Sequence, residues 1–167
     1  MLFSSTNGSG KSFPISNIGR PWLLHNLLPT QARLCRITRT TPSPNCLFCV
    51  EPVTDDVRLH TFTDCSQSTL AMNWLVSMIR EMDPNISKEK IVLLDLTPTE
   101  EKYLLQCVWL VAEVLSFIWE KRRSRSQIDM PRMKSEIKAK SSMLSKSLLF
   151  GEAGNEINER INQSHPG

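Results

Sequence analysis

The sequence lacks the features that direct a chain into a membrane or out of the cell. Its longest apolar stretch, residues 103–119, is seventeen residues long and includes Gln106 and Glu113, whereas a spanning helix needs about 20 mostly apolar residues. The first residues contain no charged segment followed by an apolar run, so they do not form a secretory signal. We therefore expect a soluble intracellular protein without a membrane partner, in which thiols stay reduced. The odd number of cysteines, five, also argues against a complete set of internal disulfides.

Motifs of self-sufficient active sites are absent as well. The sequence has no Gly-x-Ser-x-Gly elbow, no His-Glu-x-x-His zinc helix and no aspartate pair of a polymerase palm. The stretch GSGKS at residues 8–12 ends like a phosphate-binding loop, but that loop needs a glycine where this chain has Ser5, and a strand before it. We interpret GSGKS as part of a flexible tail and predict that the chain is not an enzyme.

Acidic residues are missing from residues 1–49, which hold five basic residues, and this uneven distribution is more informative than the formal net charge of +3. Residues 50–119 have a net charge of −6, and residues 120–140 have a net charge of +5. Two basic segments on either side of an acidic centre can contact phosphates. A solvated protein surface has the same composition, so charge alone leaves both interpretations open.

Spacing of apolar residues predicts a mainly α-helical fold. The expected architecture is a small helical domain with disordered tails at both ends and one loop, rich in cysteine and histidine, that a zinc ion would stabilise. Pro42 and Pro44 stiffen a loop that leads into a cluster of cysteines. The predicted organisation is a disordered tail over residues 1–19, a helical lead-in over 20–43, a zinc-binding segment over 44–66, a helical region over 67–149, and a polar tail over 150–167.

Within the helical region, residues 99–121 predict a long central helix, with Thr97 as its N-cap and Glu100 completing a capping box. Residues 132–149 predict a further amphipathic helix that buries Met133 and Ile137. The stretch KEKIVLLDL at residues 88–96 fits either a strand or a short helical turn. An earlier helix presents one apolar face, formed by Leu70, Trp74, Leu75, Met78 and Ile79.

Four potential metal ligands lie within twenty residues: Cys46, Cys49, His60 and Cys65. A Cys-x2-Cys pair can hold one metal ion because two thiolates separated by two residues converge across a tight turn, and a second pair closes the tetrahedron. Three thiolates and one imidazole are a regular ligand set for structural zinc. Because all four positions would be filled by protein, no open position would remain for a catalytic water.

Three stretches form a recognisable set: LLPTQARLCRI, then PNCLFCVEPVTDDVRLHTFTDCS, then CVWLVAEVLSFIWEKRRS. Together they resemble the carboxy-terminal region of non-LTR (LINE-type) retrotransposon reverse transcriptases, and the resemblance covers about residues 21–148. It implies that Cys46, Cys49, His60 and Cys65 bind zinc beside a polymerase, and that the region handles nucleic acid. The polymerase palm and endonuclease of that family are not in this chain, so reverse transcription is not carried over. Three origins of the chain stay open: a fragment of such a protein, a decayed copy of the element, or a host gene built from such an element.

Residues that would contact RNA or single-stranded DNA lie on both sides of the cluster. Their basic side chains would bind phosphates with little sequence preference, and Phe48 would stack on an unpaired base, although Phe48 fits packing around the metal equally well. For Phe62 we favour packing. The basic candidates are Arg33, Arg36 and Arg39 before the cluster and Lys121, Arg122, Arg123 and Arg125 after the long helix.

Two functions of different classes follow. The first is a zinc-stabilised nucleic-acid-binding module, which requires the two basic segments to lie on one side of the fold. The second is a non-catalytic structural or protein-interaction remnant, in which zinc only stabilises the fold. That alternative predicts an exposed apolar patch where a polymerase domain would dock.

Overall fold

The computed structural model describes residues 45–46, 48–52, 59–144 and 151–163, and within these residues every regular element is a helix. The mainly α-helical fold is thereby confirmed. The predicted tail over 1–19 and the helical lead-in over 20–43 lie outside the described residues. The elements are η1 (His60–Asp64), α4 (Thr69–Arg80), α5 (Lys88–Leu93), α6 (Lys102–Ser124), α7 (Met130–Leu144) and α8 (Gly151–Gln163).

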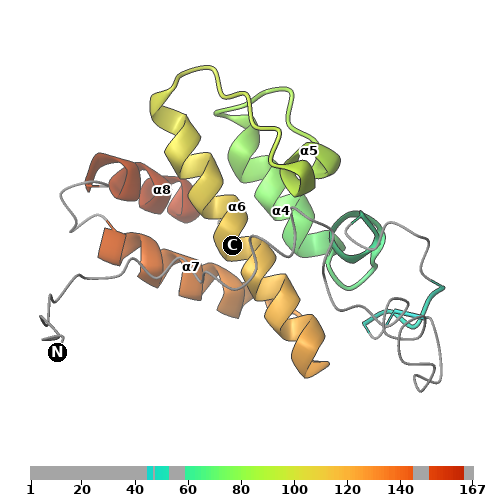
Figure 1. The fold of residues 1–167 in the computed structure, drawn as a ribbon. Helices are drawn as coiled ribbons and strands as arrows, with labels where there is room; N and C mark the ends of the chain where they lie inside the picture. Colours follow the sequence, from blue (N-terminus) through green and yellow to red (C-terminus); the bar gives the residue numbers. More distant parts are fainter. Residues whose placement is uncertain (1–44, 47, 53–58, 145–150, 164–167) are drawn as a thin grey trace, which may run out of the picture.

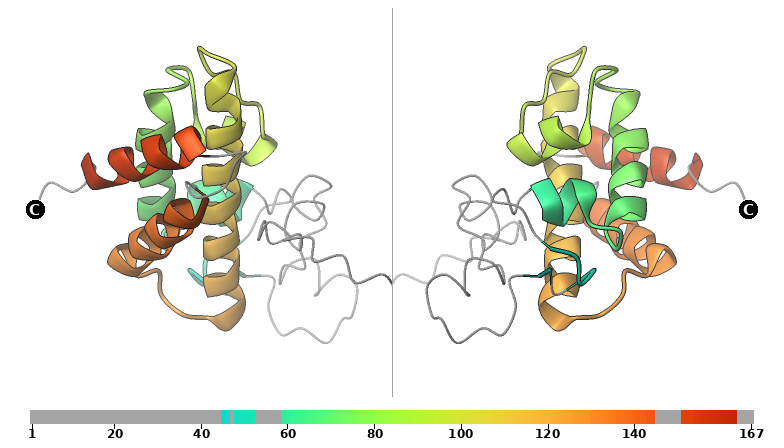
Figure 2. Two further views of the ribbon diagram at one scale, coloured as in Figure 1. Left: turned by 90° about the vertical axis from the view of Figure 1, so that its left-hand side faces the viewer. Right: turned by 90° about the vertical axis from the view of Figure 1, so that its right-hand side faces the viewer.

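The long helix α6 crosses the middle of the fold, with α4 and α5 to one side and α7 and α8 to the other (Figures 1 and 2). Its buried residues occupy more than one face, including Trp109, Leu110, Val114 and Ile118. A helix that is apolar over so wide an arc must pack on several sides. By length and composition α6 could cross a membrane, but 56% of its most apolar window is buried inside the molecule, as expected of a core helix.

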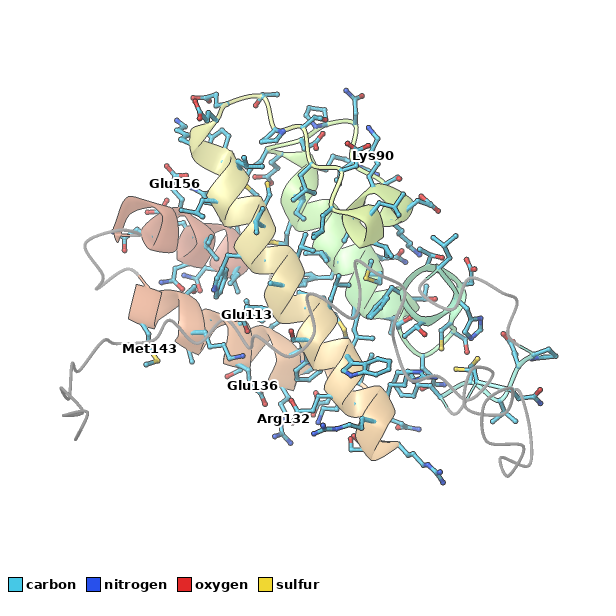
Figure 3. All side chains as sticks on the ribbon, in the orientation of Figure 1. Lys90, Glu113, Arg132, Glu136, Met143 and Glu156 are labelled. Atoms are coloured by element: carbon cyan, nitrogen blue, oxygen red, sulfur yellow. The ribbon has the colours of Figure 1, made fainter. Side chains whose placement is uncertain are left out.

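Two polar residues that interrupt the apolar stretch of α6 attach the last two helices. Glu113 is buried and faces α7, where the Lys140 Nζ lies 2.5 Å from its Oε2 (Figure 3). Gln106 is also buried, and its Nε2 donates to Oε2 of Glu156 on α8 at 2.7 Å. Buried polar groups are stabilising only when they are paired, so these two contacts fix where α7 and α8 can lie on α6.

The start of α6 differs from the predicted capping box. The helix begins at Lys102 and its N-cap, Glu101, makes no side-chain capping bond. Thr97 instead donates its backbone N–H to Oδ2 of the buried Asp83 at 2.8 Å. The prediction of Thr97 as N-cap is therefore wrong, because a carboxylate from the turn after α4 competes for the same residue and holds it outside the helix.

The ambiguous stretch at residues 88–96 forms a helix, α5, and not a strand. Ser87 caps it by accepting a hydrogen bond from the Lys90 N–H at 3.3 Å, and Leu94 ends it in the left-handed region at φ 57°. A non-glycine residue at positive φ is uncommon, and here its N–H and that of Asp95 return to carbonyls of the last helical turn.

Residues 150–167 require a correction, because they were predicted to be a polar tail. Gly151–Gln163 form α8, which packs against α6 and α7 and buries Ile157 and Ile161. These two side chains are four residues apart and so lie on one helical face. A second correction concerns Leu70, which was placed on the buried face of α4 but is 67% exposed. The other four residues predicted for that face are buried, as are Met133 and Ile137 of α7.

Candidate metal centre

The first half of the site is a tight turn that contains Cys46 and Cys49. The Val50 N–H donates to the Cys46 carbonyl at 2.9 Å, and the Cys46 N–H donates to the Glu51 carbonyl at 2.8 Å. The Phe48 N–H points at the Cys46 Sγ, 3.4 Å away. Such N–H···S contacts stabilise the anionic form of a thiol, which is the form that binds metals. The turn is closed by Val50 at φ 67°, a strained value for a β-branched residue.

The second half of the site is η1, a single wide turn between His60 and Cys65. The Cys65 N–H donates to the His60 carbonyl at 2.7 Å, a bond between residues five apart. On an α-helix, residues three or four apart share a face, whereas residues five apart do not. The wider π-type turn brings the two ends of the His-x4-Cys segment together, and such turns are frequent at functional sites. The spacing of these two ligands is therefore explained by the local backbone.

Hydroxyl groups join η1 to the start of α4. The Ser68 Oγ donates to the Thr61 carbonyl at 2.8 Å and lies 3.1 Å from the Cys65 carbonyl. Thr63 closes the turn from its other end, with Oγ1 donating to the Leu59 carbonyl at 2.6 Å. These positioning residues were missed from the sequence, although the run of Ser and Thr before an apolar helix is a signal that could have found them.

Phe62 anchors the site to the core. Its ring is 1% exposed and belongs to the same hydrophobic cluster as residues of α4 and α6. η1 accordingly packs against α4 and α5. The packing role favoured for Phe62 is confirmed, whereas Phe48 is only half-buried at the edge of the site.

The four candidate ligands converge. One ligand atom from each of Cys46, Cys49, His60 and Cys65 can be chosen so that all lie within 4.8 Å of one another. The Cys49 Sγ is 3.3 Å from the His60 Nε2. A tetrahedral ion with bonds of about 2.3 Å to sulfur separates neighbouring sulfurs by about 3.8 Å, so the cluster has the size of a single metal site. All four cysteines of the described residues are free of disulfides. The four candidate ligands, Cys46, Cys49, His60 and Cys65, are therefore positioned to hold a metal ion.

The three thiols of the cluster differ in the direction in which their pKa is shifted. A hydrogen bond from the Cys65 thiol lowers the pKa of Cys46, aided by backbone N–H groups and opposed by burial. The same bond, together with burial, raises the pKa of Cys65. Burial also raises the pKa of Cys49. A divalent cation among them would favour the thiolate form of all three, because coordinating thiols lose their protons.

Only some of the residues predicted to contact nucleic acid lie in the part of the chain that the structure describes. Arg33, Arg36 and Arg39 lie outside the described residues, so their position relative to the second basic segment is not described. Of that second segment, two side chains lie on rings of their own helix: the Lys121 Nζ is 5.2 Å from the Phe117 ring centroid, and the Arg122 guanidinium is 5.0 Å from that of Trp119.

The remaining two basic residues, Arg123 and Arg125, are exposed at the end of α6. Neither forms an ion pair with a carboxylate in the part of the chain that the structure describes. Cations at a helix C-terminus also interact favourably with the helix dipole, which by itself explains their presence.

Comparison of the chain with protein-family models, curated proteins and solved structures found no match.

Proposed function

We propose that Cys46, Cys49, His60 and Cys65 bind one zinc ion, and that its role is structural. The observation that carries this proposal is the convergence of three thiols and one imidazole within 4.8 Å at the edge of a helical core. Zinc prefers this tetrahedral set of sulfur and nitrogen ligands. With four protein ligands the ion would have no open position for water, so it would hold η1 against the Cys46–Cys49 turn without catalysing a reaction.

Zinc content measured per chain tests the metal proposal. We expect one zinc per purified wild-type chain, close to none for Cys49→Ser, and one for the matched control Cys107→Ala, which changes a buried cysteine outside the cluster. Addition of a chelator should lower the melting temperature of the wild type and of the control, but not that of Cys49→Ser. Zinc-free wild-type protein with freely titratable thiols would contradict the proposal.

We further propose that this zinc-stabilised module binds RNA or single-stranded DNA through the end of α6. Support comes from Arg123 and Arg125, two exposed guanidinium groups without a carboxylate partner among the described residues. The resemblance to the carboxy-terminal region of retrotransposon reverse transcriptases points to the same ligand. Contacts of this kind are made to phosphates, so binding would be sensitive to salt and tolerant of sequence.

Affinity for single-stranded RNA and DNA across a salt series tests this second proposal. Loss of two phosphate contacts in an Arg123→Gln/Arg125→Gln variant should reduce the salt slope by roughly 1.4, at about 0.7 for each contact. A Lys102→Gln/Lys138→Gln variant removes the same charge elsewhere on the surface and should keep the wild-type slope. No binding of the wild type at low salt, or equal slopes for the two variants, would refute it.

A protein-interaction module is the second candidate, and one observation favours it. Leu104 and Leu105 are adjacent at the start of α6 and are 41% and 47% exposed. Exposed neighbouring apolar side chains are typical of docking surfaces. The zinc experiment is common to both candidates, whereas the nucleic-acid titration separates them.

A further inference from the structure

A cavity that is lined by none of the metal ligands lies between α4 and the start of α5. An open cavity of about 390 Å³ is lined by polar and basic side chains of Asn73, Ser77, Arg80, Ser87 and Lys88. Val76 and Ile86 complete its wall. Ligand pockets range from about 300 to 1,000 Å³, so this cavity has room for a small ligand only.

The cavity is basic and contains no acidic lining residue. Arg80 is exposed and Lys88 is half-buried, and neither forms an ion pair with a carboxylate among the described residues. Two cations that share a cavity repel each other, so their proximity is favoured only if an anion is bound between them or solvent screens them.

The acidic residues that flank the cavity are engaged elsewhere. Glu81, next to Arg80, pairs with Arg160 of α8. Asp83 is buried and accepts hydrogen bonds from the N–H groups of Asn85 and Thr97. Glu89, the residue after Lys88, is a remaining negative charge; hydrogen bonds from its own backbone N–H and from the Ser87 hydroxyl, together with the charge of Lys88, lower its pKa. Among the described residues, Glu81 and Asp83 are therefore engaged away from the cavity, and Glu89 is the carboxylate that acts on Lys88.

We propose that this cavity binds a phosphate monoester, with Arg80 and Lys88 holding its oxygens and the Asn73 amide as a further donor. A monoester carries close to two negative charges at neutral pH and so matches two cations, whereas a diester carries one. An arginine fork and a lysine ammonium are the usual side chains for such oxygens. The aliphatic wall of Val76 and Ile86 can contact the carbon skeleton that carries the phosphate.

This site is separate from the surface proposed for nucleic acid. The Thr99 N–H donates to the Met82 carbonyl at 2.9 Å, which places the end of α4 beside the approach to the start of α6. Arg123 lies near the other end of this 23-residue helix, which spans about 34 Å at about 1.5 Å per residue. Figure 1 shows the connection from α4 to α5 near the start of α6 and far from its end. The phosphate proposal therefore does not depend on nucleic-acid binding.

Titration of the zinc-loaded chain with inorganic phosphate, followed by backbone amide chemical shifts, tests the proposal. We expect one saturable site, with a Kd on the order of 1 mM, and the largest shifts at Ser77, Arg80 and Lys88. AMP should bind at the same place, and a 5′-phosphorylated dinucleotide should bind there while its 5′-hydroxyl form does not. This pair shows that the terminal monoester, and not the internal diester, is bound, and a comparison of the AMP and dinucleotide affinities shows whether a free nucleotide or a strand terminus fits better. Dimethyl phosphate, a diester, should bind at least fivefold more weakly.

Neither Arg80 nor Lys88 is buried in the core, so each can be substituted without opening a cavity there. Arg80→Gln and Lys88→Gln should each weaken phosphate binding about tenfold, the effect of losing one charge-assisted hydrogen bond. Lys138→Gln on α7 is the matched control and should bind phosphate like the wild type. Linear shifts without saturation, equal shifts with chloride at the same ionic strength, or unchanged affinity in both cavity variants would overturn the proposal. Equal binding of the diester would overturn the assignment to a monoester.

Discussion

Ile161 in α8 offers the most direct test of how the last helix is held. Its side chain is 0% exposed, and Ile157, one turn earlier, is 1% exposed. Truncation of a fully buried isoleucine to alanine costs about 2–5 kcal/mol, which combines the lost transfer free energy with the cavity that remains. For a chain of this size each kcal/mol lowers the melting temperature by about 3 °C, so Ile161→Ala should melt roughly 10 °C below the wild type.

Thermal and guanidinium unfolding of Ile161→Ala and Glu159→Ala provide the comparison. Glu159 is exposed on the same helix, so its substitution should change the free energy of unfolding by no more than about 0.5 kcal/mol. Zinc content should stay at one ion per chain in both variants, because η1 packs on α4 and α5 whereas α8 packs on α6 and α7. Indistinguishable unfolding curves for the two variants would show that α8 does not dock, and the reasoning from burial would fail.

Two further predictions concern single residues. Val50→Gly should stabilise the folded chain by about 1 kcal/mol, because glycine adopts φ 67° without the strain that a β-branched residue suffers. Unfolding measured in the presence of zinc tests this prediction, and a loss of stability would contradict it. Burial raises the pKa of Cys107 to about 11 from 9.0, so the unfolded chain loses this proton first as pH rises. The free energy of unfolding should therefore fall by up to about 3 kcal/mol between pH 9 and pH 11. The Cys107→Ala variant should lose less stability over this interval, and parallel profiles of stability against pH for the wild type and the variant would exclude the effect.

The central helices could be predicted from sequence because their apolar residues recur with helical spacing. Trp74, Ile79 and Ile118 illustrate this, since all three are buried where periodicity places them. The same method failed for α8, which has only Ile157 and Ile161 as apolar anchors among charged and amide residues. Two isoleucines make too weak a periodic signal, and their burial depends on surfaces that α6 and α7 provide.

Local sequence rules also failed where a distant residue competes. Thr97 has the right neighbours for an N-cap, but Asp83, fourteen residues earlier, takes its N–H. Leu70 fits the apolar stripe of α4, yet it lies in the first turn and is 67% exposed, so none of the described elements buries it. Both errors arise because propensity and periodicity describe one segment at a time, whereas burial and hydrogen bonding are decided between segments.

The candidate ligands of the metal centre follow from the amino-acid sequence alone, since a Cys-x2-Cys turn and a His-x4-Cys segment each define a ligand pair through short-range geometry. That the two pairs meet depends on the fold, because η1 is held by Phe62 in the core and by Ser68 at the start of α4. The cavity of Arg80 and Lys88 likewise depends on the fold. Neither residue is distinctive in the sequence, and only the fold places both of them on the wall of one cavity.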